Sequence, residues 1–129
     1  MSTDRVWPVL FDQITWDADL AASSPRGREV AAGWRRSVEQ DGGVRQRDLG
    51  GLRPKDHDGL HLPGSVKVYL PDPSSGSIKD SPWGAVLKLV DQPQIALLVL
   101  AFGIRHPEAT RSTKPSVYAT AHRRLFPAR

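Results

Sequence analysis

The order of hydrophobic and polar positions predicts three strands in the second half of the chain. Residues Ser65–Leu70 alternate, so Lys67 and Tyr69 take the face opposite the apolar side chains. Trp83–Val90 is a further segment of strand length, and Ile95–Phe102 is an uninterrupted apolar run typical of a buried central strand. A loop rich in proline and serine, Pro71–Pro82, separates the first two segments, and the short turn Asp91–Gln94 separates the second from the third. We therefore expect an antiparallel meander.

The first half of the chain favours helices instead. Thr15–Ala22 is consistent with a short helix with Thr15 as its N-cap, and Ser24, Pro25 and Gly27 are expected to break it. Arg28–Gln40 has an apolar stripe at helical spacing, made by Val30, Trp34 and Val38. Ahead of both helices, Val6–Phe11 is expected to be an edge strand because it contains a proline, Pro8.

Two further segments complete the predicted order. Residues 41–64 hold several glycines with mixed charge and are expected to be a long loop with room for one helical turn. Ser116–Leu125 is predicted to be a short C-terminal helix with Ser116 as its N-cap. The fold class that follows is α+β, in one domain over residues 1–129: a small antiparallel sheet of about four strands, covered by the two N-terminal helices, with a short C-terminal helix.

Charge and cysteine content narrow the functional classes. The 129 residues include 18 Lys and Arg against 14 Asp and Glu, a net charge of +4, and the excess lies in the second half. A basic region of this kind favours a polyanionic partner. The absence of cysteine excludes disulfides, zinc ribbons and thiol nucleophiles. Because no apolar stretch is long enough for a membrane and no signal peptide is evident, we expect a cytoplasmic protein that does not bind membranes.

Two possible ligand motifs are weak. Asp56–His61 holds His57 and His61 at a spacing that suits zinc on a helix, but Gly59 interrupts it. The histidines and aspartates of this polar loop are expected to be solvated. The sequence has no phosphate-binding P-loop motif. We therefore expect neither a metal nor another cofactor.

The most specific pattern is in the last 47 residues. An aromatic-led strand from Trp83 ends at Asp91, the apolar strand Ile95–Phe102 follows, and Gly103-Ile104-Arg105 comes directly after it. The final helix has the sequence VYATAHRRL. This arrangement resembles the RelE/ParE toxin superfamily, the small toxins of bacterial type II toxin–antitoxin systems.

The resemblance implies a metal-independent endoribonuclease, an mRNA interferase that cleaves ribosome-bound mRNA with the 2′-hydroxyl of the RNA as nucleophile. It also implies a cognate antitoxin, with which the chain would form a hetero-oligomer. By this resemblance the catalytic residues are Arg105, Tyr118 and Lys67. Arg105 would stabilise the phosphate charge through its planar guanidinium. Tyr118 is open to two interpretations, a functional phenol or a core aromatic.

The chain departs from the family pattern at two positions. Gly84 and Tyr69 stand where many cleaving members have basic residues, and Lys88, on the same strand face as Gly84, is a candidate to replace one of them. Further RNA-binding candidates are basic or imidazole side chains of the last quarter of the chain: Arg111, Lys114, His122 and Arg123. His106 and His122 are also candidates for proton transfer, because the pKa of an imidazole lies close to neutral pH.

These departures leave other functions open. One alternative is a non-catalytic binder, either a ParE-like inhibitor of DNA gyrase or a toxin fold that has lost its active site. Another is a small basic nucleic-acid-binding domain, which should carry aromatic residues among basic ones on a sheet face. Tyr69 and Trp83 are the candidates for that role.

Overall fold

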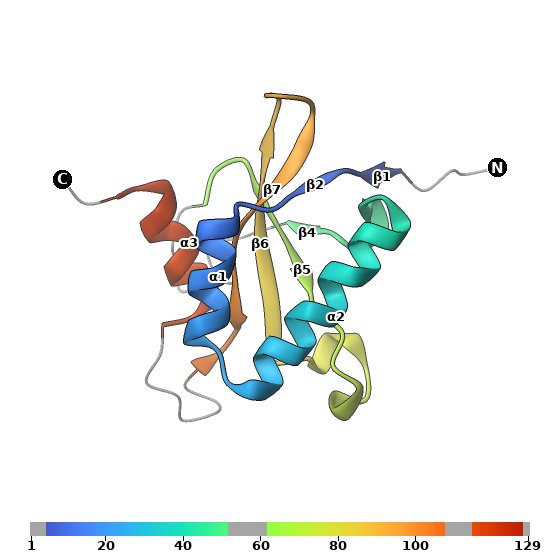
Figure 1. Ribbon diagram of the computed structural model, residues 1–129, viewed down its shortest axis with the longest axis vertical. Coiled ribbons are helices and arrows are strands. Elements are labelled where there is room, and N and C mark those ends of the chain that lie inside the picture. The colour runs from blue at the N-terminus through green and yellow to red at the C-terminus, as the bar shows by residue number, and fades with distance from the viewer. Residues whose placement is uncertain (1–4, 52–61, 108–114, 128–129) are drawn as a thin grey trace.

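The computed structural model describes residues 5–51, 62–107 and 115–127. Over these ranges the chain is an α+β protein with a five-stranded and a two-stranded sheet (Figure 1). The α-helices are α1 (Gln13–Ala22), α2 (Pro25–Asp41) and α3 (Val117–Leu125). The strands are β1 (Val6–Trp7), β2 (Val9–Leu10), β3 (Val44–Arg45), β4 (Gly50–Gly51), β5 (Ser65–Tyr69), β6 (Trp83–Val90) and β7 (Ala96–Ile104).

The larger sheet is mixed, with the strand order β2-β7-β6-β5-β4. The predicted antiparallel meander is confirmed for β5, β6 and β7, but β2 pairs in parallel with β7. The expected antiparallel sheet of about four strands is therefore confirmed in part: the sheet has five strands, and β2 runs parallel to β7. The backbone carbonyl of Pro8 accepts a hydrogen bond from the Leu97 N–H at 2.8 Å, which fixes the N-terminal segment at the sheet edge.

The central strand is β6, not the apolar run that contains β7. β7 still lies inside the sheet, between β6 and β2, and most of its side chains are buried or partly buried. Ile95, the first residue of the predicted strand, is exposed and precedes β7. The N-terminal strand divides at Pro8 into β1, which pairs with β3, and β2.

The junction between the two N-terminal helices differs from its prediction. α1 begins at Gln13 after Asp12, and the Thr15 hydroxyl donates to the Asp12 carbonyl instead of acting as the N-cap. Ser24 caps α2 by accepting a hydrogen bond from the Gly27 N–H at 3.1 Å. Pro25 occupies the first position of this helix, where its missing N–H costs nothing. The residues expected to break a helix therefore start one.

The two helices α1 and α2 cover one face of the sheet, as predicted (Figure 1). Val30, Trp34 and Val38 of α2 are buried there beside Trp16 of α1. Sheet side chains complete this apolar cluster, including Val68, Leu70, Trp83, Ala85, Leu87, Leu97, Val99 and Phe102. We call this side of the sheet the covered face.

The opposite face is covered in part by α3. Ser116 is the N-cap of this helix, as predicted, and accepts a hydrogen bond from the Ala119 N–H. Its buried side chains, Val117, Tyr118 and Ala121, pack on the sheet in a second apolar cluster. The other buried members of this cluster are Leu62, Val86 and Ala101. We call this side the partly open face, because part of β5 lies outside this cluster.

Two connections contain more structure than expected. The predicted loop 41–64 includes β3, the 3₁₀ turn Gln46–Asp48 and β4, while residues 52–61 lie outside the described residues. The β5–β6 connection includes the 3₁₀ turns Pro73–Ser75 and Ile78–Asp80. No helix in the described part of the chain has the length and apolar character needed to cross a membrane.

Candidate nucleic-acid interface

Two cations flank an aromatic ring on the partly open face. Lys67 and Tyr69 alternate with the buried Val68 in β5, so both point away from the covered face. The guanidinium carbon of Arg105 lies 3.8 Å from the centroid of the Tyr69 ring, and the Lys67 ammonium lies 5.6 Å from it. Both distances suit cation–π contacts. We call Lys67, Tyr69 and Arg105 the cation–tyrosine cluster.

The chain positions Arg105 through main-chain contacts at the end of β7. Its own N–H donates to the Pro82 carbonyl at 2.8 Å. Its Nη1 donates to the carbonyls of Ser81 at 2.8 Å and Lys79 at 3.3 Å. Nε is buried and has no partner in the described part of the chain. The side chain is therefore held in one orientation, and one of its two terminal nitrogens is already used.

Gly84 provides the room for this arrangement. A Cβ atom at position 84 would lie 2.9 Å from Arg105 Cγ and 3.1 Å from Arg105 Cδ. Gly84 faces Tyr69 across the β5–β6 pair, so the arginine crosses the sheet over a position without a side chain. Arg105 can therefore stack on Tyr69 only because position 84 has no side chain, basic or otherwise.

Lys67 is directed toward the edge strand β4. It pairs with Gly50, and a Cβ at position 50 would lie 3.0 Å from Lys67 Cε. A cavity of about 240 Å³ adjoins this lysine and Tyr69. Arg47 and Asp48 contribute to its wall. The cavity therefore has basic side chains and an aromatic side chain next to one another, the combination that binds nucleic-acid phosphates and bases.

Two of the predicted catalytic residues do not join the cluster. Tyr118 is only 3% exposed and packs with Val86 and Ala101 beneath α3, which agrees with the core interpretation. Lys88 shares the strand face of Gly84 but lies four residues farther along β6, a distance of about 13 Å. It pairs with Ser65 at the other end of β5 and is exposed.

The predicted RNA-binding residues are spread over the structure. On α3, His122 is half-buried with its ring 5.1 Å from that of Phe126, and Arg123 is exposed. His106 is exposed and directly follows Arg105. Arg111 and Lys114 lie outside the described residues, as do His57 and His61. The structure therefore brings Lys67 and Arg105 together and leaves the α3 residues elsewhere.

Two buried carboxylates that accept hydrogen bonds from arginines were not predicted from the sequence. Asp19 of α1 accepts from Arg124 Nη2 at 2.7 Å, from Arg124 Nη1 at 2.9 Å, and from the Phe102 N–H at 3.1 Å. The available clue was its spacing three residues after Trp16, which places it on the buried side of a short helix.

The second carboxylate, Asp72, joins the β5–β6 connection to α2. It binds Arg26 and accepts hydrogen bonds from the Ser74 N–H at 3.0 Å and from Trp83 Nε1 at 3.2 Å. The hydrogen bond from Arg26, followed by those from Ser74, lowers the pKa of the Asp72 carboxyl to about 2, although burial opposes the shift. Asp72 accepts from Ser74 two residues on, which is typical of a turn and could have been predicted.

Within residues 5–51, 62–107 and 115–127, no three His, Asp or Glu side chains lie together as possible metal ligands. No protein-family model, curated protein or solved structure matches this chain. The function is therefore inferred from the geometry of the cation–tyrosine cluster and from the sequence motifs.

Proposed function

We propose that the protein is a RelE-like toxin of a type II toxin–antitoxin system that acts on ribosome-bound mRNA. The observation that supports this proposal is the cation–tyrosine cluster, which holds Lys67 and Arg105 against Tyr69 on the partly open face. Cations near a phosphate and an aromatic ring near a base are the two elements of single-strand RNA recognition. The cluster lies where the sequence motif implies the catalytic arginine, directly after β7.

The proposed chemistry requires no group that the chain does not supply. The 2′-hydroxyl oxygen of the RNA attacks the adjacent phosphorus and loses its proton, the bond to the 5′-oxygen breaks, and that oxygen gains a proton. The products are a 2′,3′-cyclic phosphate and a 5′-hydroxyl end. Arg105 Nη2, which has no hydrogen-bond partner within the described residues, and the Lys67 ammonium would stabilise the developing charge. The imidazole of His106 would exchange the protons.

A second candidate function has a specific observation in its favour. Tyr118 is buried in the apolar cluster of α3, and Arg105 uses Nη1 for hydrogen bonds to two carbonyls. A site with fewer catalytic groups favours binding without cleavage. In this alternative, the protein is a non-catalytic, ParE-like inhibitor of DNA gyrase.

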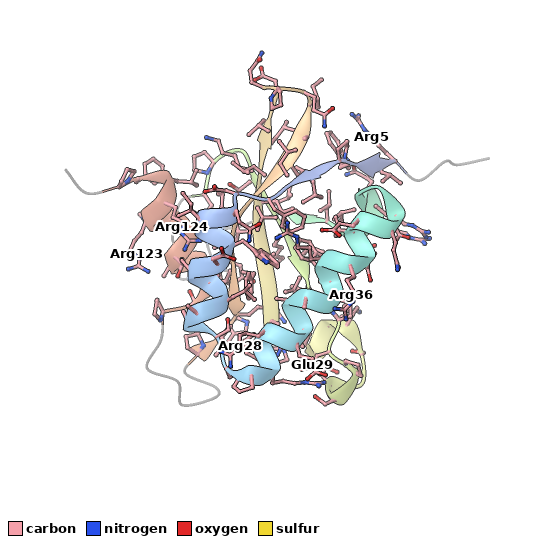
Figure 2. All side chains as sticks on the ribbon, in the orientation of Figure 1. Arg5, Arg28, Glu29, Arg36, Arg123 and Arg124 are labelled. Carbon is pink, nitrogen blue, oxygen red and sulfur yellow. The ribbon has the colours of Figure 1, made fainter. Side chains whose placement is uncertain are left out.

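Primer extension on ribosome-bound mRNA tests the proposal. The wild type should cleave in the presence of EDTA and leave a cyclic phosphate or its 3′-phosphate hydrolysis product. Lys67→Gln should lower the rate by a factor of about 10² if the ammonium stabilises the transition state. Arg36→Gln is the matched control, since it removes one positive charge from an exposed position on α2, in the helical layer over the covered face (Figure 2).

The same samples separate the two candidates. If the wild type does not cleave RNA but inhibits gyrase supercoiling, the second function replaces the first. Expression of the chain alone should arrest growth in both cases, and co-expression of its antitoxin should restore it. Soluble expression without any growth defect would contradict both.

A further inference from the structure

Between α1 and α3, main-chain groups on the outer edge of β7 form hydrogen bonds with side chains instead of with a strand. β2 pairs only with Leu97 and Leu98, so in the described part of the chain the rest of this edge has no neighbouring strand. Beyond it, the Phe102 N–H donates to Asp19 Oδ2, and the Leu100 carbonyl accepts from Arg124 Nη1 at 2.6 Å. The ion pair Asp19–Arg124 thus binds one N–H and one carbonyl of β7 that a neighbouring strand would otherwise bind. Figure 2 shows Arg124 reaching from α3 toward α1.

The hydrogen bonds from Asp19 and Arg124 reach only as far as Phe102, whereas β7 continues to Ile104. The Arg105 N–H points to Pro82 and Gly103 pairs with Gly84, so alternation turns the main-chain groups of Phe102 and Ile104 away from β6. The Phe102 carbonyl and the Ile104 N–H therefore face outward. Neither has a hydrogen-bond partner within the described residues. About 7 Å of strand edge remains available.

The available edge opens into a cavity with a volume of about 420 Å³. This volume is in the range of binding pockets. Ala18 and Ala22 of α1 form one wall and Val117 and Thr120 of α3 the other. We call this cavity the β7-edge groove. It is separate from the cation–tyrosine cluster, since none of that cluster's side chains lines it.

The charge of the groove indicates the kind of occupant. Asp19 is neutralised by its ion pair with Arg124. Arg123 is exposed and lines the groove, and Arg28 lies beside it, because its Nη1 donates to the carbonyl of the groove residue Ser23 at 2.7 Å. Among the described residues, the unpaired charge around the groove is therefore positive. An incoming segment with acidic side chains would complement it.

We propose that the β7-edge groove binds an extended acidic peptide segment of a protein partner, which adds to β7 as a short strand. The peptide main chain would donate to the Phe102 carbonyl and accept from the Ile104 N–H, as in strand addition to an exposed sheet edge. Its acidic side chains would lie near Arg123 and Arg28. This inference does not depend on the RNA chemistry of the opposite site.

Hydrogen exchange of the Ile104 amide, followed by NMR on the full chain, tests the inference. The probe is a short synthetic peptide that alternates glutamate with valine and is blocked at both ends. At saturating peptide, exchange at Ile104 should slow by about tenfold or more, because the amide becomes hydrogen-bonded. The same peptide with lysine in place of glutamate should leave this amide unprotected.

Two variants of neighbouring alanines provide the matched control. Ala22→Glu places a negative charge in the groove wall and should abolish protection by the acidic peptide. Ala21→Glu lies on the same exposed end of α1 but outside the groove, and it should bind as the wild type does. Equal effects of the two variants would overturn the proposal, as would equal binding of the lysine peptide.

The free protein gives a further decisive outcome. If the Ile104 amide is already protected in dilute protein without peptide, the chain itself covers the edge and the proposal is wrong. If protection appears only as the protein concentration rises, a second copy occupies the groove, and the acidic partner is likewise rejected.

Discussion

The two faces of the sheet are built in different ways. The covered face is packed by large apolar side chains from α1, α2 and four strands, with Trp16 and Trp34 near its centre. The partly open face has a smaller apolar cluster beneath α3. Beside that cluster, Lys67, Tyr69 and Arg105 are held by cation–π contacts and by hydrogen bonds to carbonyls.

This difference separates the residues that stabilise the fold from those available for binding. Burial of apolar area provides most of the free energy of folding, so the covered face should determine stability. A cation–π contact at a solvent-accessible site contributes much less. The cation–tyrosine cluster can therefore carry binding groups, because the fold depends on it only weakly.

The largest predicted effect compares two aromatic residues, one from each face. Trp34→Ala should lower the free energy of unfolding by about 3–5 kcal/mol, since Trp34 is buried and contacts the rings of Phe11 and Trp16. Tyr69→Ala should lower it by about 1 kcal/mol. Urea unfolding of both variants measures the two values. Equal losses would show that the faces do not differ in the way described.

The next comparison uses two glycines of α2. A Cβ at Gly27 would lie 2.7 Å from a ring carbon of Trp83 and 3.1 Å from Ser23 Cβ, whereas at Gly33 the nearest atom is 3.8 Å away. Gly27→Ala should therefore destabilise the protein by about 2 kcal/mol through overpacking of the covered face. Gly33→Ala should stabilise it by up to about 1 kcal/mol through helix propensity. Opposite shifts in melting temperature are expected, and shifts of the same sign would contradict this packing.

Local patterns determined most of the secondary structure. The segment Trp83–Val90 was predicted with the bounds of β6, and the stripe Val30, Trp34 and Val38 faces the sheet as expected. The start of α2 was predicted wrongly because the effect of a proline depends on its position. Pro disrupts a helix from within but is favourable at its first position, which Pro25 occupies. The parallel pairing of β2 with β7 depends on contacts between distant residues, which periodicity does not specify.

The candidate site was predictable only in part, for a similar reason. The motif pointed to Arg105 and Lys67, and the structure brings them together through Tyr69. Tyr118 was uncertain because its burial depends on which side of α3 meets the sheet. The Asp19–Arg124 pair joins residues 105 positions apart, and no local pattern indicates such a contact.

Low pH should remove the contribution to stability of the Asp72 carboxylate, which links Arg26 of α2 to Trp83 of the covered face. The pKa of Asp72 is lowered to about 2, so its carboxylate stabilises the fold above the unfolded pKa of about 3.9. This contribution is lost as the pH falls from about 4 to about 2. Asp72→Asn should cost about 1–2 kcal/mol at neutral pH. Its deficit relative to wild type should shrink across that acid range, as measured by urea unfolding. A constant deficit would show that the carboxylate charge does not contribute.

The smallest effect on stability is expected at Gly84, on the partly open face. Gly84→Ala adds a Cβ 2.9 Å from Arg105 Cγ and 3.4 Å from the Val68 carbonyl, so the arginine must shift from its stacked position. Because a flexible side chain yields more easily than a helix or an indole, the cost should be about 1 kcal/mol, below that of Gly27→Ala. Binding of a single-stranded RNA should nevertheless weaken, since Arg105 no longer lies over Tyr69. Fluorescence anisotropy with labelled RNA measures this, with Gly33→Ala as the control. A stable Gly84→Ala protein that binds RNA as tightly as the wild type would show that stacking of Arg105 on Tyr69 is not part of the binding surface.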